Sequence, residues 1–208
     1  MAPARTPTPP PVDGRRARGE RTRLRVLEAL LALVEEGELR PTAQEVASRA
    51  GVALRTVYHH FEDVEALRRM ALNLQLTRHR EMFQTIDPKD DLDERIRLLS
   101  RQLRKLFEVV TPIRRATLFD EHSSAEMAEG LRSSRQVRRN HVAATFAPEI
   151  ARRSADGRSL LDALDTTTSW QSWYYMRTSL DRTPNAAEKI LVITLTDLLN
   201  GKAQKAKR

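Results

Sequence analysis

The stretch TAQEVASRAGVALRTVYHHF, residues 42–61, has the pattern of two short helices joined by a tight turn. Thr42 can cap the first helix, and Glu45, three residues later, completes a capping box. Gly51 ends that helix, because glycine adopts the left-handed backbone conformation that such a turn requires. The second helix is expected directly after the turn and ends near Phe61. The stretch therefore predicts a helix-turn-helix.

The second helix of this pair has an apolar face and a polar face. Val57 and Phe61 are spaced to point inward. Arg55, Tyr58 and His59 lie on the opposite face at i, i+3 and i+4 spacing. These side chains suit a helix that enters the major groove of DNA, where Arg pairs with guanine and Tyr or His reaches phosphate or thymine methyl groups. A helix-turn-helix that serves only packing or protein contact is the alternative.

The neighbouring histidines His59 and His60 do not have the pattern of a metal site. Adjacent residues on a helix point about 100° apart. No third histidine stands at ligand spacing from them. The sequence therefore predicts neither a metal site nor a cofactor.

The composition favours a helical protein. The chain has 208 residues, only seven glycines and no cysteine. The lack of cysteine excludes disulfides and thiolate-bound zinc and fits a reducing cytoplasm. No apolar run approaches the roughly 20 residues of a membrane span, and the N-terminus lacks an apolar signal core. We therefore expect a cytoplasmic protein without a membrane partner.

The net charge of +8 is concentrated at the two ends of the chain. Residues 1–25 carry a net +5 and residues 202–208 carry +4, which leaves −1 for everything between them. Residues 1–14 also hold five of the ten prolines, so they are expected to be disordered. Basic tails attract phosphate without sequence preference. A non-specific, nucleoid-type DNA binder and a merely solubilising tail are both consistent with the charge alone.

Capping signals and apolar spacing predict an all-α fold of about nine helices. Asp63 can cap the helix that follows the helix-turn-helix. Thr111-Pro112 and Ser123 with Glu126 have the pattern of further helix starts. One apolar stripe is formed by Leu92, Ile96, Leu99, Leu103, Phe107 and Val110. The last two helices are expected at about 159–178 and 184–199, the latter capped by Thr183 and closed by Asn200-Gly201.

The segment 42–67, TAQEVASRAGVALRTVYHHFEDVEAL, resembles the DNA-binding domain of the TetR family of transcriptional regulators. That domain has the pattern T-x-x-x-[IVL]-A-x-x-A-G-V-S-x-G-x-[LV]-Y-x-[YH]-F-x-x-K-x-x-L. The matching positions are Thr42, Val46, Ala47, Ala50, Gly51, Val52, Val57, Tyr58, His60, Phe61 and Leu67. Three positions depart from the pattern: Ala53 replaces the usual Ser cap, Arg55 the usual Gly, and Val64 the usual Lys.

The resemblance implies a role for each matched position and for its neighbours. Thr42 and Thr56 would bind phosphate; Gln44, Leu54 and Arg55 would face bases; Tyr58, His59 and His60 would contact the DNA backbone or base methyl groups. Residues 26–72 hold five Arg against eight acidic residues. DNA affinity is therefore expected to depend on Arg55 and on a basic arm that could lie in the minor groove. That arm consists of Arg15, Arg16, Arg18, Arg21 and Arg23.

The resemblance also implies a domain organisation and partners. Residues 1–20 would be a disordered basic arm, 21–70 the DNA-binding domain, 71–201 a ligand-binding and dimerisation domain, and 202–208 a basic tail. The final helix is apolar over more of its circumference than one contact face needs, which indicates a homodimer through the last two helices, with burial inside one monomer as the alternative. The expected function is a dimeric repressor that binds a palindromic operator in double-stranded DNA and responds to an unknown small-molecule effector.

Candidate ligand-binding residues are fewer and less specific. Trp170 and Tyr174 belong to an aromatic cluster that could line a pocket or simply fill the core. Phe119 and His122 lie in or beside the polar segment Asp120-Glu121-His122, which could be a ligand-specific group or only a solvated loop. An all-helical enzyme that uses this segment is a further alternative. None of the nucleotide-binding, metalloprotease or nucleophile-elbow motifs occurs in the chain, and we expect no catalytic residue.

Overall fold

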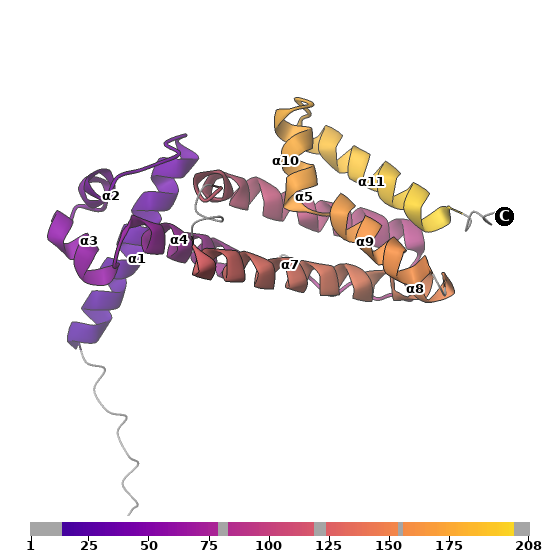
Figure 1. The fold of residues 1–208 in the computed structure, drawn as a ribbon, viewed down its shortest axis with the longest axis horizontal. Coiled ribbons are helices and arrows are strands. Elements are labelled where there is room, and N and C mark those ends of the chain that lie inside the picture. Colours follow the sequence, from indigo (N-terminus) through magenta and orange to yellow (C-terminus); the bar gives the residue numbers. More distant parts are fainter. Residues whose placement is uncertain (1–13, 79–82, 119–123, 154–155, 202–208) are drawn as a thin grey trace, which may run out of the picture. The chain divides into compact units, whose positions relative to one another are not determined.

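The computed structural model describes residues 14–78, 83–118, 124–153 and 156–201. All regular structure in these residues is helical, which confirms the predicted all-α class, with ten helices rather than nine. The chain divides into two compact units, residues 1–71 and 72–208. The helices are α1 (Gly14–Glu35), α2 (Ala43–Ala50), α3 (Leu54–His60), α4 (Val64–Arg78), α5 (Leu92–Ala116), α7 (Ala125–Thr145), α8 (Ala147–Arg152), α9 (Gly157–Thr167), α10 (Trp170–Thr178) and α11 (Pro184–Asn200) (Figure 1).

The first unit contains the predicted helix-turn-helix, formed by α2 and α3 against α1. The N–H of Glu45 donates to Thr42 Oγ1 at 3.2 Å, and the N–H of Thr42 donates to Glu45 Oε2 at 2.7 Å, so the capping box is present. Gly51 has φ 63° and ψ 40°, the left-handed conformation that the turn was expected to need. The apolar faces meet in a core that contains Val26, Leu30, Val46, Val57, Phe61 and Leu67.

The first helix begins earlier than the sequence predicts. α1 starts at Gly14, so residues 14–20 are helical, whereas they were expected to belong to a disordered arm. Arg, Ala and Glu dominate this segment and are good helix formers. Because the buried stripe of α1 already nucleates the helix, adding such residues at its N-terminal end costs little. Gly19 is the one weak position inside the run, and Gly14 stands at its first residue.

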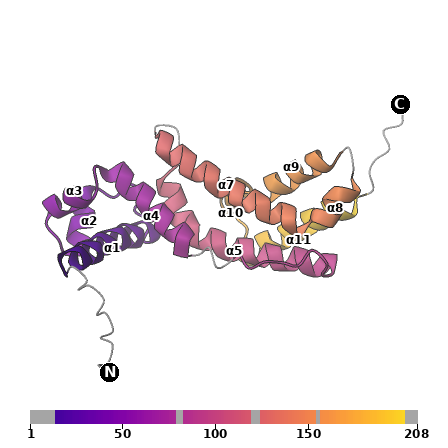
Figure 2. The ribbon, with the colours of Figure 1, turned by 90° about the horizontal axis from the view of Figure 1, so that it is seen from below.

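The second unit is a bundle of helices around α5. α11 packs along α5, α10 packs on both, and α7, α8 and α9 pack on one another (Figure 2). The predicted α5 stripe is confirmed: Ile96, Leu99, Leu103, Phe107 and Val110 are buried, and Leu92 is partly buried. The core is completed by side chains from α7, α9, α10 and α11, including Val142, Phe146, Leu160, Leu164, Trp170, Trp173, Met176, Leu191 and Leu195.

Two predicted helix boundaries in this unit are wrong. Thr111-Pro112 does not start a helix, because α5 continues through Pro112 to Ala116. The buried stripe extends to Ile113, and its packing outweighs the one backbone hydrogen bond that proline removes. Conversely, the helix expected over 159–178 is broken into α9 and α10 at Ser169, whose Oγ accepts from the N–H of Ser172 at 3.1 Å and caps α10.

The other helix starts follow local signals. Asp63 Oδ1 accepts from the N–H of Ala66 at 2.6 Å, as expected for a cap at the start of α4. Thr183 caps α11, which ends at Asn200 with Gly201 as its C-cap residue, as predicted. α7 is capped by Ser124, one residue beyond the predicted Ser123, which lies outside the described residues. No helix in the described part of the chain is long and apolar enough to cross a membrane.

A buried ion pair joins α5 to α8. Arg95 donates from Nη1 to Glu149 Oε2 at 2.8 Å and from Nη2 to Glu149 Oε1 at 2.9 Å. The same guanidinium donates to the carbonyl oxygens of Asp90 and Thr145 at 2.9 Å and 2.8 Å. Both charged side chains are only 4% exposed. This fully bonded pair anchors the short helix α8 on the bundle.

Candidate nucleic-acid interface and ligand pocket

The polar face of α3 is exposed, as its spacing predicts. Arg55, Tyr58 and His59 are all exposed, with 53% of Tyr58 accessible. Arg55 and Tyr58 make no hydrogen bond or ion pair with any other residue that the structure describes. Their donors are therefore available for an external partner. On the opposite side Val57 is 2% exposed and anchors the helix in the core of the first unit.

The start of α3 lacks a side-chain cap, as the Ala53 departure predicts. Leu54 is exposed and Thr56 is half-buried at this end of the helix. The N–H of Thr56 donates to the carbonyl of Ala53 at 2.8 Å. The first backbone N–H groups of α3 therefore lack the bond that a serine at position 53 would supply.

Thr42 and Gln44 are exposed on the neighbouring helix α2, but the Thr42 hydroxyl is already engaged. Thr42 Oγ1 lies 2.8 Å from Glu45 Oε2 and donates to it. The hydrogen bonds from the backbone N–H and the hydroxyl of Thr42 outweigh burial and lower the pKa of Glu45 below 4.5. A phosphate that accepts a hydrogen bond from the Thr42 hydroxyl would have to displace the Glu45 carboxylate. The Gln44 amide has only a long contact of 3.5 Å to Ser48 Oγ.

His59 and His60 differ in burial. Their rings meet edge to face with centroids 5.2 Å apart, and His60 is half-buried beside Phe61 while His59 is exposed. Burial, followed by the charges of His59 and Arg23 and opposed by Glu20, lowers the pKa of His60 below 6.5. His60 is therefore mainly neutral at pH 7. No group of three metal-binding side chains lies together among the residues that the structure describes.

The arginines predicted to form a flexible arm lie on α1. Arg16, Arg18 and Arg21 are exposed there, and the side chain of Arg15 lies outside the described part. Arg23 is held against its own unit, with its guanidinium 5.8 Å from the centre of the Phe61 ring and Nη2 3.1 Å from Met70 Sδ. A helix presents these side chains in fixed directions, whereas residues 1–20 were expected to form a disordered arm.

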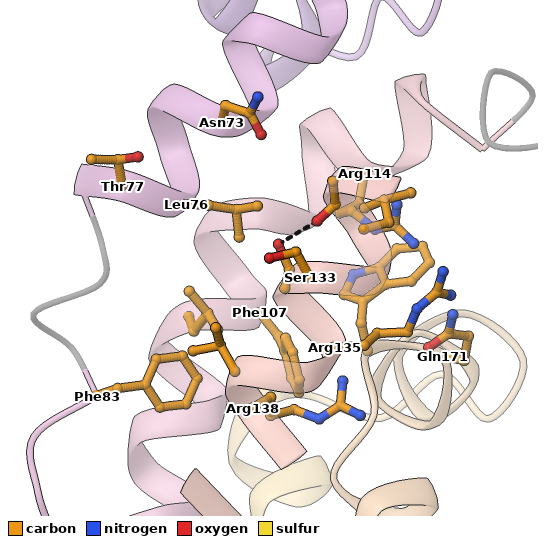
Figure 3. A pocket seen from close by; sticks show the side chains of 16 residues that line it. Asn73, Leu76, Thr77, Phe83, Phe107, Arg114, Ser133, Arg135, Arg138 and Gln171 are labelled. Atoms are coloured by element: carbon orange, nitrogen blue, oxygen red, sulfur yellow. Dashed lines mark hydrogen bonds between the residues drawn. The ribbon is translucent and has the colours of Figure 1, made fainter. Parts of the chain in front are cut away.

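The second unit contains a pocket of about 290 Å³. Its walls come from α4, α5, α7 and α10 and from the segment before α5 (Figure 3). Of the four predicted ligand-binding residues, Trp170 lines this pocket. Tyr174 does not line it but stacks on Trp170, with ring centroids 4.8 Å apart. Phe119, His122 and the rest of the Asp120-Glu121-His122 segment lie outside the described residues.

The pocket is also lined by three arginines that the sequence analysis did not predict as site residues, namely Arg114, Arg135 and Arg138. Arg114 and Arg138 are 6% and 8% exposed. A sequence signal for both exists, because each occupies a buried position in an apolar stripe. Arg114 follows Val110 by four residues, and Arg138 precedes Val142 by four. A charged residue in such a stripe marks a buried polar site.

The surface of α10 and α11 carries exposed apolar side chains. Tyr175 is 57% exposed and Ile193 is 62% exposed. A shallow groove with walls from both helices runs beside them, lined in part by Ile190, Thr194 and Met176. The apolar surface of α11 thus extends beyond the side that packs on α5, as its sequence indicates.

Comparison with solved structures shows what this fold resembles. The chain is similar to a transcriptional regulator from Rhodococcus sp. Rha1, at 20% identity and TM-score 0.67, over 86% of this chain and 96% of the other. It is also similar to a putative TetR-family regulator from Mesorhizobium loti MAFF303099, at 17% identity and TM-score 0.60, over 88% of this chain and 96% of the other. A third similar structure is a TetR-family regulator from Marinobacter aquaeolei VT8, at 18% identity and TM-score 0.51, over 88% of this chain and 97% of the other. No family model and no curated protein matches the sequence. The chain therefore has the fold of TetR-type transcriptional regulators.

Proposed function

We propose that this protein is a sequence-specific DNA-binding transcriptional regulator that reads its site with α3. The fold supports a DNA-binding regulator. The observation that carries the proposal is the exposed face of α3, where Arg55, Tyr58 and His59 stand together on a helix whose other side is buried. Arg presents a fork of donors that matches the O6 and N7 acceptors of guanine in the major groove.

The other residues of the proposed interface surround this face. Gln44 and Leu54 would contact bases next to Arg55, and Thr42 and Thr56 would bind phosphate at the two helix starts. Tyr58, His59 and His60 would contact the backbone or base methyl groups. His60 would contribute as a neutral imidazole at pH 7, because its pKa is lowered. Arg16, Arg18 and Arg21 on α1 would add phosphate contacts, and the basic tail at 202–208 would add non-specific attraction.

The protein would act as a homodimer through α10 and α11. The exposed Tyr175 and Ile193 supply an apolar face on these two helices. Pairing this face with its copy would form a four-helix arrangement with two-fold symmetry. A two-fold dimer binds a palindromic operator, with one α3 in each half-site.

A ligand in the 290 Å³ pocket would control DNA binding through α4. Residues 64–71 of this helix belong to the first unit, and Asn73, Leu76 and Thr77 in its second part line the pocket. A ligand that binds more tightly to the conformation without DNA would release the operator, as expected of a repressor. Only that difference in ligand affinity can drive the change.

Selection of bound sequences from a random DNA pool, followed by footprinting, tests the DNA-binding part of the proposal. We expect a short palindromic protected site. Arg55→Gln should weaken binding to the selected site by about 1–3 kcal/mol and relax base preference at one position in each half-site. Arg158→Gln is the matched control, because it removes the same charge from an exposed position on α9. The absence of any preferred sequence, with affinity that follows salt alone, would instead indicate a non-specific binder.

A further inference from the structure

We propose that the pocket binds an organic acid with one carboxylate and an aromatic or aliphatic body of about ten carbon atoms, a size that follows from its volume. The inference rests on the proposed regulator function and names the chemical class of its effector. It is carried by the combination of buried arginine side chains, an apolar wall and the lack of any acidic residue among the described residues of the lining.

The buried guanidinium of Arg138 is the strongest sign of an anion. Its Nη2 donates to Asp165 Oδ1 at 2.6 Å, but its buried Nε has no hydrogen-bond partner among the residues that the structure describes. Asp165 also pairs with Arg139, with 3.4 Å between Oδ2 and Nη1, so one carboxylate serves two cations. A buried donor without an acceptor is unfavourable, and a ligand oxygen would satisfy it.

The rest of the polar lining also favours an anionic ligand. Arg114 and Arg135 bring two more guanidinium groups to the pocket wall, and Gln171 adds an amide. The described lining contains neither Asp nor Glu. An anion is therefore matched by the charges of the wall, whereas an organic cation would meet cations without a lining carboxylate. Arg114 also lies 4.7 Å from the ring centre of Trp170, which holds the indole at the pocket surface.

The opposite part of the wall is apolar. In Figure 3 Leu76 and Phe83 lie on one side of the pocket, while Arg114, Arg135 and Gln171 lie on the other. Phe107, Leu106 and Leu131 extend the apolar lining. A cavity of about 150 Å³ holds a benzene molecule. The observed 290 Å³ is roughly twice that volume, so a bicyclic arene or a medium-length alkyl chain fits together with its carboxylate.

Calorimetric titration of the full chain with matched probes tests this inference without any mutation. The probes are 1-naphthoate, its neutral amide and 1-naphthylmethylamine, which share the aromatic body and differ in charge. We expect naphthoate to bind about tenfold to hundredfold more tightly than the amide, as expected for a charge-assisted hydrogen bond, and the amine to bind more weakly still. Equal binding of acid and amide, tighter binding of the amine, or no binding of naphthoate at about 1 mM would overturn the inference.

Two variants on α7 locate the carboxylate. Arg138→Gln should remove most of the preference for naphthoate over the amide. Arg132→Gln is the matched control, because Arg132 is exposed on the same helix, pairs with Glu129 and does not line the pocket. An acid preference that survives in Arg138→Gln would overturn the placement. If Arg138→Gln fails to fold, the probe series on the unmodified chain still decides the ligand class.

The DNA experiment separates this inference from the proposed function. Footprinting without ligand shows whether the chain selects a site, whatever the pocket binds. A protected palindrome together with equal binding of acid and amide would refute the ligand class and leave the regulator intact. Selective naphthoate binding without any preferred DNA site would refute the regulator and support the anion pocket.

Discussion

Removing one partner of the Arg95–Glu149 pair should destabilise the second unit strongly. The pair is bidentate, at 2.8 Å and 2.9 Å, and both side chains are only 4% exposed. Arg95→Met leaves a buried carboxylate whose remaining cation is the exposed Arg152, 2.6 Å from Glu149 Oε1, and Glu149→Leu leaves a buried guanidinium without its carboxylate. Each single change should lower the free energy of unfolding by about 3–5 kcal/mol, because it removes the buried partner that compensates the remaining charge for its lost hydration.

Replacing both residues should restore most of that stability. The double variant Arg95→Met/Glu149→Leu buries no charge, so the desolvation of both ions is avoided. It still leaves the carbonyl oxygens of Asp90 and Thr145 without the guanidinium, which costs about 1 kcal/mol each. We therefore expect a net loss of about 2 kcal/mol or less, well below the sum of the single changes.

The pH dependence provides a second readout of the same pair. Burial opposes ionisation of Glu149, but the hydrogen bonds from Arg95, the backbone hydrogen bond of Glu149 and the charges of Arg95 and Arg152 together outweigh it and lower the pKa of Glu149 below 4.5. Its contribution to stability is therefore complete above the pKa of the unfolded chain and is lost as pH falls through the lower folded value. In Arg95→Met only the backbone hydrogen bond of Glu149 and the charge of Arg152 still oppose burial, so the folded pKa of Glu149 should rise. A higher folded pKa reduces the stabilisation that the Glu149 carboxylate gives above the pKa of the unfolded chain.

Urea unfolding of the four proteins at several pH values measures both effects as a double-mutant cycle. Strictly additive single and double changes would refute the reasoning, because they would mean that the two charges do not depend on each other. The free energy of unfolding of Arg95→Met should also depend differently on pH in the acid range. If that dependence is unchanged, the inferred cause of the low Glu149 pKa is wrong.

Three further predictions concern the first unit and the α11 surface. Thr42→Ala should lower the free energy of unfolding by about 1 kcal/mol through loss of the α2 cap, whereas Thr42→Ser should keep the cap. Urea unfolding measures both variants, and equal stabilities would contradict the capping role. Gly51→Ala should cost about 1–2 kcal/mol from backbone strain alone, since no described atom lies within 4 Å of the added Cβ; an unchanged melting temperature would rule this out. Ile193→Glu should yield monomers of unchanged fold in analytical ultracentrifugation, while the exposed Arg158→Glu control stays dimeric; a persistent Ile193→Glu dimer would move the interface elsewhere.

The helix-turn-helix could be predicted in detail because its signals are local. Thr42 and Glu45 are three residues apart, and the conformation of Gly51 follows from its lack of a Cβ. The exposed face of α3 follows from helical spacing once the apolar residues are assigned to the core. These features depend on contacts within a few residues, which a sequence displays directly.

Helix boundaries were less predictable where local signals competed with packing. Thr111-Pro112 has the pattern of a helix start, yet Trp170 Nε1 donates to Thr111 Oγ1 at 3.0 Å and the buried stripe runs on to Ile113. The hydroxyl that could have capped a new helix serves a contact 59 residues away. Pro112 is accommodated because the packing gained by a continuous α5 exceeds one lost backbone bond.

The sequence by itself determined the all-α class, the helix-turn-helix and the polar face of α3, because periodicity and capping are local properties of the chain. Only the tertiary structure decided which charges are buried together. Arg95 and Glu149 are 54 residues apart, and the pocket gathers Leu76, Arg114, Arg138 and Trp170 from four helices. Such sites arise where separate apolar stripes meet, and their partners and volume depend on how the helices pack.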